Sequence, residues 1–195
     1  MDQPARKQAR VGPTIHPTSV IAPGAILIGQ VTVEAECFIG PNAVLRGDIE
    51  PILIRKGSNV QDNCTIHTEK GSPVVIGPDA SVGHGAVVHG ATVKERALIG
   101  MNAVVLNGAV IGERAVVGAM TLVPNNFVVP PGTLAVGSPC VLKKQGDPAI
   151  AQMAHMNTER YHRYRLEHLA GLWGTVVGPL NDNGQFANRN GPDPR

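Results

Sequence analysis

The sequence predicts an all-β protein, a parallel β-helix of hexapeptide repeats, followed by one C-terminal helix. Three observations support this fold class. Aliphatic residues recur at every sixth position along most of the chain, small residues hold fixed places between them, and aromatic residues make up only 3% of the 195 residues. A period of six fits neither the helical period of about 3.6 nor a long alternating strand, but a short strand followed by a tight turn repeats in this way.

The aliphatic repeat predicts a β-helix over residues 11–142, after an N-terminal extension over residues 1–10. Three extra residues interrupt the repeat around Glu50 to Ile52, four more interrupt it around Lys70 to Pro73, and one later step is a residue short. Three hexapeptides make a coil of 18 residues, so the 19 steps give about six coils. The repeat positions are Ile15, Ile21, Leu27, Val33, Ile39, Leu45, Ile54, Val60, Ile66, Ile76, Val82, Val88, Val93, Ile99, Val105, Ile111, Val117, Val123 and Val129.

Glycine and other small residues complete the repeat. We expect the glycines that follow the aliphatic residue to supply backbone conformations that other residues resist. They are Gly40, Gly77, Gly83, Gly100, Gly112 and Gly118. Cys37 and Cys64 occupy the small inward place of the repeat, so we interpret them as core thiols rather than metal ligands. The pattern resembles the [LIV]-G-x-x-[small]-x signature of left-handed β-helices, and this resemblance implies the left hand.

A helix is predicted over residues 146–173, because Pro148 suits a first helical turn and a partly apolar stripe follows it. The stripe contains Ile150, Met153, Tyr161, Tyr164, Leu169 and Leu172. We expect the helix to pack along the β-helix or against a neighbouring chain. Residues 174–195 are rich in glycine, asparagine and proline and are predicted to form a flexible tail.

Composition excludes several classes of partner. The formal net charge is +2 and no basic run is present, which argues against a nucleic-acid partner. No segment approaches the ~18 apolar residues of a membrane span, and no apolar stretch follows the basic N-terminus as in a secretory signal. Three cysteines without close pairs fit a reduced protein, so we expect a cytoplasmic location.

Two histidines fall in register on successive coils. His67 and His89 are 22 residues apart, which is one coil of 18 plus the insertion of four. Arg46 precedes His67 by 21 residues, which is one coil plus the insertion of three, so the three residues form a column. Coils are spaced by about 4.8 Å, and imidazoles at that spacing can share a metal ion. A stacked pair of plain solvated histidines is the alternative.

His84 follows Gly83 on the preceding face and should point away from the column of its own chain. It could complete a site only if another subunit packed there, and three such contacts around an axis would make a closed cyclic trimer. The other histidines show no comparable geometry and are interpreted as surface or helix residues. They are His16, His155, His162 and His168.

Four segments together resemble the γ-class carbonic anhydrases. They are RGD at 46–48, NVQDNCTIH at 59–67, VGHGAVVHGATV at 82–93 and IGMNAVVLNGAVIG at 99–112. The resemblance implies a homotrimer with zinc, or iron or cobalt, between subunits. His67 and His89 would come from one chain and His84 from its neighbour. A three-histidine site with one open position is a catalytic pattern, and the metal-bound hydroxide would hydrate carbon dioxide reversibly to bicarbonate.

The same resemblance implies roles for other residues. Gln61 would hydrogen-bond near the metal-bound hydroxide, and Tyr161 would approach the pocket from an adjacent chain, unless it only packs there. Arg46 and Asp48 would link subunits beside the site, either in catalysis or as a structural ion pair. Asn59 and Asp62 would be polar residues behind the ligands.

The sequence departs from the family around the proton path. The long acidic loop after the first histidine is reduced to TEKGSPVV, with Glu69 as its one carboxylate, and Ile49 stands where an acidic residue is expected after RGD. Rapid carbon dioxide hydration needs such a path. Glu69 is a candidate substitute, although a lone loop glutamate is more often only solvated.

Length and the long C-terminal helix resemble a subgroup that contains phenylacetic acid degradation and carnitine-operon proteins. Carbonic anhydrase activity and acyl-CoA thioester hydrolysis are both associated with this scaffold, and fold alone does not settle function. Besides a zinc carbonic anhydrase, three alternatives stay open: a metal-dependent acyl-CoA thioesterase, a non-catalytic trimeric scaffold, and a hexapeptide acyltransferase. Thioester turnover, metal without activity, and acyl transfer without metal would distinguish them.

Overall fold

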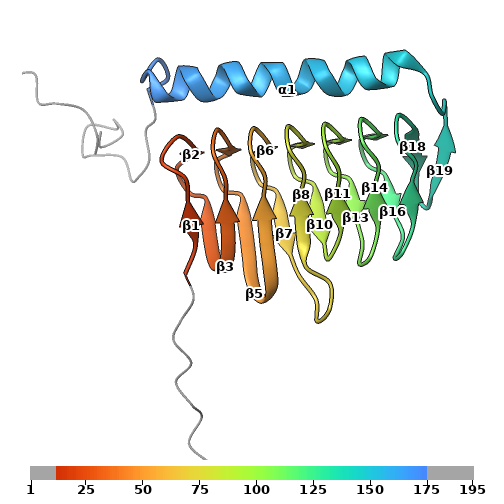
Figure 1. Ribbon diagram of the computed structural model, residues 1–195, viewed down its shortest axis with the longest axis horizontal. Coiled ribbons are helices and arrows are strands. Elements are labelled where there is room, and N and C mark those ends of the chain that lie inside the picture. Colours follow the sequence, from red (N-terminus) through yellow and green to blue (C-terminus); the bar gives the residue numbers. More distant parts are fainter. Residues whose placement is uncertain (1–11, 175–195) are drawn as a thin grey trace, which may run out of the picture.

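The computed structural model describes residues 12–174, and it confirms the left-handed parallel β-helix with one C-terminal helix. Figure 1 shows the coils stacked in a row with helix α1 running along them. The extension predicted over residues 1–10 lies outside the described residues, as does the tail predicted over 174–195 apart from Gly174.

The coils form two sheets. Strands of the first sheet belong to two faces that share β5: β1 (Thr14–Ile15), β3 (Ile26–Val33), β5 (Val44–Ile54), β7 (Thr65–His67), β8 (Val74–Ile76), β10 (Val87–His89), β11 (Thr92–Val93), β13 (Val104–Val105), β14 (Val110–Ile111), β16 (Leu122–Val123) and β17 (Val128–Val129). The second sheet is the third face: β2 (Val20–Ile21), β4 (Phe38–Ile39), β6 (Asn59–Val60), β9 (Ser81–Val82), β12 (Leu98–Ile99), β15 (Val116–Val117), β18 (Leu134–Gly137) and β19 (Cys140–Lys143). Strands of successive coils pair in parallel, whereas β18 and β19 pair antiparallel at the end.

The core contains the columns that the repeat predicts. Aliphatic repeat residues such as Leu45, Ile66 and Val88 are fully buried, and so are the small residues that face them. Cys37 and Cys64 have no exposed surface, which confirms that both point inward. Burial raises the pKa of the Cys64 thiol to about 12 and also raises the pKa of Cys37, so both stay protonated in the core.

The glycines that follow the aliphatic residues are required for a different reason from the predicted one. Gly77, Gly83 and Gly100 are absent from the residues with positive φ, so the expectation of an unusual backbone is wrong. A Cβ atom at these positions would meet backbone atoms of the next coil at 2.5 to 2.8 Å. Glycine is needed there because coils approach closely. The left-handed conformation belongs to another turn position, held by asparagine at Asn63 and Asn102, for example.

The two interruptions of the repeat lie against each other beside β7. The Glu50 backbone N–H donates to the buried Thr68 hydroxyl at 3.1 Å. The Gly71 N–H in turn donates to the Glu50 carboxylate at 3.0 Å. The strands on either side of the insertions keep their register, since Arg46 pairs with His67 and Ile54 pairs with Ile76.

Helix α1 spans Pro148–Leu169, which is shorter than the predicted 146–173. It begins after Asp147, whose side chain accepts a hydrogen bond from the Ala149 N–H at 2.9 Å and so caps the first turn. It ends because Gly171 adopts a positive φ of 68° just beyond the C-cap. No helix among residues 12–174 is long and apolar enough to cross a membrane.

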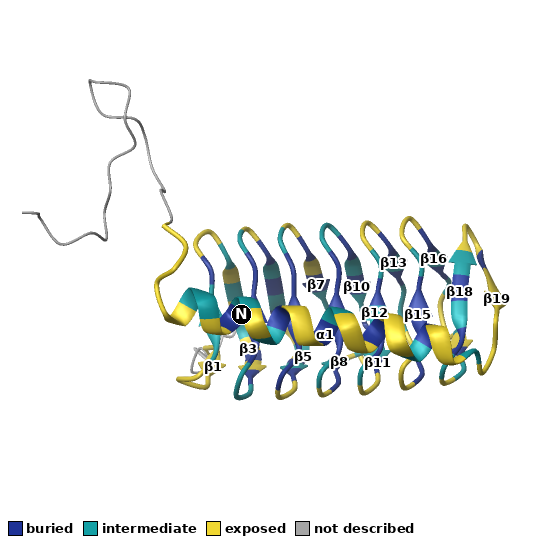
Figure 2. Cartoon of the chain, turned by 90° about the horizontal axis from the view of Figure 1, so that it is seen from above, coloured by how far each residue is buried: buried dark blue, intermediate teal, exposed yellow. Residues whose placement is uncertain are grey.

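Helix α1 packs on the second sheet, as Figures 1 and 2 show. Its buried residues are Ile150, Ala154, Thr158, Tyr161 and Arg165. The predicted stripe is therefore only partly right, since Ile150 and Tyr161 are buried but Met153, Leu169 and Leu172 are exposed. Polar residues take contact positions because they find partners on the β-helix. Arg165 donates to the Thr18 carbonyl at 3.0 Å, and Thr158 donates to the Asp79 carbonyl at 2.7 Å.

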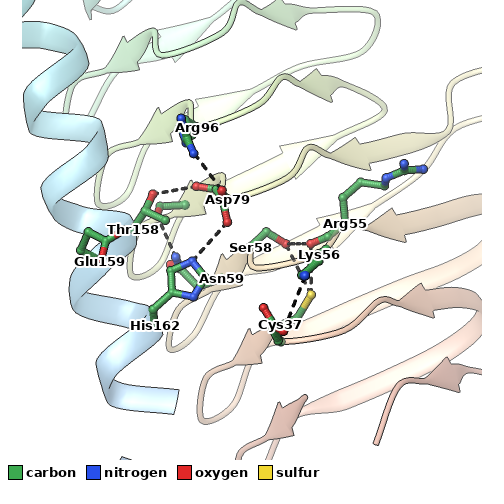
Figure 3. A network of polar contacts seen from close by, with 12 residues as sticks. Cys37, Arg55, Lys56, Ser58, Asn59, Asp79, Arg96, Thr158, Glu159 and His162 are labelled. Carbon is green, nitrogen blue, oxygen red and sulfur yellow. Dashed lines mark hydrogen bonds and ion pairs between the residues drawn. The ribbon is translucent and has the colours of Figure 1, made fainter. Parts of the chain in front are cut away.

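Asp79 is the main polar anchor of the helix. In Figure 3 its carboxylate faces His162 of α1 on one side and Arg96 on the other. The distances are 3.1 Å to His162 Nε2 and 3.6 Å to Arg96 Nε. His162 is thus a helix residue with a docking contact, in agreement with its predicted place outside the metal site.

Candidate metal centre

The predicted column of Arg46, His67 and His89 is confirmed by strand register. Arg46 on β5 pairs with His67 on β7, and His67 pairs with His89 on β10. The two imidazole rings lie edge to face with centroids 4.9 Å apart. Parallel pairing places these side chains on the same outer face of the sheet, since equivalent positions of stacked coils point the same way.

The histidine pair is arranged as a metal chelate needs it. His67 Nδ1 lies 2.9 Å from His89 Nε2. The other ring nitrogens face oxygen acceptors: His67 Nε2 lies 3.2 Å from Asp48 Oδ1, and His89 Nδ1 lies 2.6 Å from Asn107 Oδ1. With each ring proton on the nitrogen that faces its oxygen, the two facing nitrogens would be left with lone pairs that a metal ion could accept.

The nitrogen separation is close to what zinc requires. Two nitrogens at about 2.0–2.1 Å from a tetrahedral zinc ion are about 3.3 Å apart, so the rings need to part by only ~0.4 Å. Oxygen partners on the outer nitrogens fix the ring orientation and tautomer of metal-binding histidines in many proteins. The residues present thus fit a divalent metal ion.

Asp48 is held as a carboxylate beside His67. Arg46 Nη1 donates to Asp48 Oδ2 at 2.7 Å. This hydrogen bond, together with the one from His67, lowers the pKa of Asp48 below its usual value. Arg46 and Asp48, which the resemblance implies link subunits, form this ion pair within one chain, and both side chains are partly exposed.

Asn107 belongs to this centre but was not among the residues predicted from the sequence. It lies 18 residues after His89, which is the length of one coil, and that spacing was the available signal. An asparagine is not itself a typical zinc ligand, so its residue type gives no separate signal. We call Arg46, Asp48, His67, His89 and Asn107 the strand-side cluster.

His84 lies in the turn between β9 and β10, before the strand that ends with His89, and it contacts helix α1. Its Nδ1 is 3.0 Å from Asp62 Oδ2, and its Nε2 is 3.3 Å from the Tyr161 hydroxyl. Burial raises the pKa of Tyr161, so this hydroxyl keeps its proton and can donate it to Nε2. The His84 side chain remains 45% exposed, which leaves it accessible to another molecule.

Buried side-chain amides hold the turn that carries His84 through a chain of hydrogen bonds. Gln61 is 2% exposed, and its Oε1 accepts the His84 backbone N–H at 3.1 Å. Its Nε2 donates to Asn59 at 3.1 Å, and Asn59 donates to the Ser81 hydroxyl at 2.7 Å. The chain of amides fixes the turn that carries His84. Asn59, Gln61, Asp62, His84 and Tyr161 form the helix-side cluster.

The nine site residues predicted from the sequence thus fall into two clusters rather than one. Among residues 12–174, one chain brings together no group of three or more metal-binding side chains. His84 contacts Asp62 and Tyr161, as expected for a histidine on the preceding face. In both clusters each histidine has one ring nitrogen held by an oxygen, from Asp48, Asn107 or Asp62.

A cavity of about 410 Å³ adjoins the helix-side cluster. It lies between α1 and the second sheet, and no pattern in the sequence predicted it. Its polar lining contains Gln61, His84, Asn157, Arg160 and Tyr161, whereas its other side chains are mainly apolar. The volume falls in the range of about 300–1,000 Å³ that is usual for small-molecule sites.

Comparison with known proteins identifies relatives of two kinds. Residues 30–68 match the family described as the hexapeptide repeat of succinyl-transferase, and residues 90–125 match the family described as bacterial transferase hexapeptide. The carnitine operon protein CaiE of Salmonella typhimurium is 39% identical over 160 residues, covering 82% of this chain and 81% of the relative. The probable carbonic anhydrase of Methanocaldococcus jannaschii is 54% identical over 119 residues, covering 61% of this chain and 75% of the relative.

Solved structures share the fold over most of the chain. A proposed acetyltransferase from Bacillus cereus has a TM-score of 0.79 at 34% identity and covers 83% of this chain and 93% of that chain. A hexapeptide transferase family protein from Anaplasma phagocytophilum has a TM-score of 0.76 at 30% identity and covers 80% of this chain and 92% of that chain.

Proposed function

Because this chain belongs to the hexapeptide-repeat family that includes γ-class carbonic anhydrases and CaiE proteins, we propose that it is a metal-dependent carbonic anhydrase. Its sites would lie between the subunits of a homotrimer and would hydrate carbon dioxide to bicarbonate. Three buried free cysteines suit a reducing compartment, so we assign this activity to the cytoplasm.

The observation that carries the proposal is that each of the three histidine rings has an oxygen partner on one of its two nitrogens. His67, His84 and His89 each have one ring nitrogen held by an oxygen acceptor, and a proton placed there would give the other nitrogen a lone pair, which in His84 faces the Tyr161 hydroxyl. Three imidazoles with an open fourth position are typical of catalytic zinc, and iron or cobalt also suit imidazole. His84 from a neighbouring subunit would complete the pair that one chain provides.

When bound, the metal would lower the pKa of a water ligand towards neutrality and so supply a nucleophile at neutral pH. The chain's own residues would orient this chemistry. Asp48 and Asn107 hold the ring protons of His67 and His89, and Asp62 holds that of His84. Gln61 is fixed in the interior by Asn59, so its amide is a rigid neighbour of the reacting groups. Arg46 keeps Asp48 ionised.

The test is stopped-flow measurement of carbon dioxide hydration on protein whose metal content is quantified. We expect about one metal ion per subunit, activity that is lost on chelation, and recovery when zinc is restored. His89→Ala should lose both metal and activity. His155→Ala is the control, because His155 is exposed on the outer side of α1. A trimer mass is expected by light scattering, and metal-free protein with full activity would exclude the proposal.

Hydrolysis of an acyl thioester is the second candidate, and the cavity beside His84 favours it. Carbon dioxide has three atoms and needs only a small part of about 410 Å³, whereas an acyl group would use the apolar walls. The same metal site would serve. Chelator-sensitive turnover of acyl-CoA thioesters, with carbon dioxide hydration near background, would replace the first candidate by this one.

Acyl transfer and a purely structural role rank lower. The transferase names of the matching families describe the repeat, and one fold supports several reactions. Acetyl transfer that persists after metal removal would favour a transferase. Full metal occupancy without hydration or hydrolysis would favour a trimeric scaffold held together by the metal.

A further inference from the structure

The floor of the cavity beneath α1 is bare backbone. Gly83, Gly100 and Gly118 occupy equivalent positions on three successive coils and all line the cavity. Gly83 and Gly100 must lack a side chain because a Cβ would meet the next coil at 2.5 to 2.8 Å, and at Gly118 it would meet the Val136 side chain at 2.8 Å. Packing of the coils therefore leaves a smooth trough that α1 covers without filling.

The walls of this trough are apolar. They are formed by Leu98, Met101, Val116, Met153 and Tyr164. Met101 and Met153 line the cavity and are also 52% and 51% exposed, so both residues keep contact with solvent. Methionine adapts to apolar ligands of different shape, because its side chain is unbranched and polarizable.

Arg160 carries the formal charge of the polar lining, since no aspartate or glutamate of residues 12–174 lines the cavity. The Asp62 carboxylate lies behind His84 at 3.0 Å and is not part of the lining. Among residues 12–174 the Arg160 side chain makes no hydrogen bond or ion pair, whereas Arg163, one turn on, pairs with Glu167 at 3.5 Å. Amide and hydroxyl groups of Gln61, Asn157 and Tyr161 lie in the same lining. An unpaired guanidinium beside apolar walls complements an anion that carries an apolar chain.

We propose that this cavity binds small monocarboxylates, with the apolar chain on the glycine floor and the carboxylate at Arg160. The site shares Gln61, His84 and Tyr161 with the helix-side cluster, but it needs no metal ion and so does not rest on the proposed reaction. A carboxylate bound there would lie next to His84 and Tyr161. The ligand class therefore includes both acids released from acyl substrates and free acids that act as effectors.

Calorimetric titration of the full-length protein with acetate, hexanoate and octanoate tests the proposal, before and after chelation of metal. We expect affinity to rise by about fourfold per methylene group until the chain fills the cavity. The metal-free protein should bind as well as the loaded one. Equal affinity for acetate and octanoate would overturn the proposal.

Paired variants on α1 locate the binding site. Arg160→Gln should weaken hexanoate binding by about tenfold without changing hexanamide binding, whereas Arg163→Gln should change neither. Met153→Ala should weaken hexanoate binding by about threefold to tenfold because a wall is lost. Met156→Ala is the matched control, since Met156 is also exposed on α1 but lies outside the lining. Equal effects of the paired variants would overturn the proposal.

Comparison of the titrations before and after chelation distinguishes this inference from the proposed function. Hexanoate that binds only metal-loaded protein, and is insensitive to Arg160→Gln, would be a ligand of the metal, which overturns the cavity proposal and leaves the metal centre intact. Hexanoate that binds metal-free protein and depends on Arg160 supports the cavity proposal, even where carbon dioxide hydration is not detected.

Discussion

The strand-side cluster is held by neighbouring strands of one sheet, whereas the helix-side cluster is held between a sheet and helix α1. His67 and His89 lie on paired strands, and register alone brings their rings to 4.9 Å. His84 is held by Gln61 and Asp62 of the β-helix, but its outer ring nitrogen is also contacted by Tyr161, which is 77 residues away in the sequence and reaches it only after α1 docks. The two clusters supply the same imidazole chemistry by different means.

This difference indicates which contacts maintain each cluster and which substitutions should disturb it. The strand-side cluster shares the stability of the β-helix core, since its strands pair on both sides. The helix-side cluster has a buried amide foundation on β6 but a cover that rests on a few contacts of α1. Loss of those contacts should therefore disturb His84 and the cavity without disturbing His67 and His89.

The largest expected effect comes from mixing two variants, one with a substitution in the strand-side cluster and the other with a substitution in the helix-side cluster. His89→Ala and His84→Ala proteins should each be inactive alone. After co-refolding in equal amounts, about one quarter of the sites in a cyclic trimer would pair an intact strand-side cluster with an intact helix-side cluster. We expect carbon dioxide hydration to recover to about a quarter of the wild-type value per subunit.

A control mixture keeps this complementation interpretable. His89→Ala mixed with His67→Ala should stay inactive, because both changes fall on the strand side. Recovery in that control, or none in the first mixture, would show that the two clusters do not meet between subunits.

Ile150→Ala is expected to release the helix. Ile150 is 3% exposed and packs with Val116 and Ala154, so its truncation should lower the free energy of unfolding of the α1 contact by about 2–4 kcal/mol. Hydrogen exchange should rise in α1 but not in β7 or β10. Leu166→Ala, at a position 56% exposed, should change stability by less than about 0.5 kcal/mol. Equal exchange in α1 and β10 would contradict the separation of the two halves.

Asn107→Ala should weaken metal binding by about 10–100-fold, measured by competition with a chromophoric chelator. The reason is that His89 Nδ1 loses the oxygen that orients its ring. Asn107→Asp keeps that oxygen and should retain most of the affinity. Asn125→Ala, one coil further on and exposed, should have no effect. A loss in Asn125→Ala as large as in Asn107→Ala would argue against a positioning role.

The smallest expected effect concerns the core thiols. An unperturbed cysteine thiol has a pKa of 9.0, but burial raises the pKa of Cys64 to about 12. Below pH 9 the thiol is neutral in both the folded and the unfolded chain, whereas above it only the unfolded chain ionises, so the free energy of unfolding should fall as pH rises towards 12. Cys64→Ala should show a shallower fall in denaturant titrations across this range. An identical slope would mean that the thiol does not contribute.

Sequence spacing predicts the strand-side column because residues one coil apart in the sequence lie at equivalent positions on successive coils. Subtracting the two insertions placed Arg46, His67 and His89 in one column, and backbone pairing has the same register. Asn107 obeys the same spacing, one coil after His89, but its residue type is not that of a metal ligand. The repeat gives the glycine positions but not their cause, because close approach of coils and a positive φ both select glycine.

The sequence by itself determined the repeat, the hand implied by its signature, the inward thiols and the stacked histidines, since all of these depend on neighbours at a fixed spacing. Only the tertiary structure decided which side of α1 is buried, where Thr158 and Arg165 find partners, and how a glycine floor and a helix enclose a cavity. Those features join residues about 35 to 150 positions apart. No local period encodes them, because the docking of α1 is set by the shape and polarity of a completed surface.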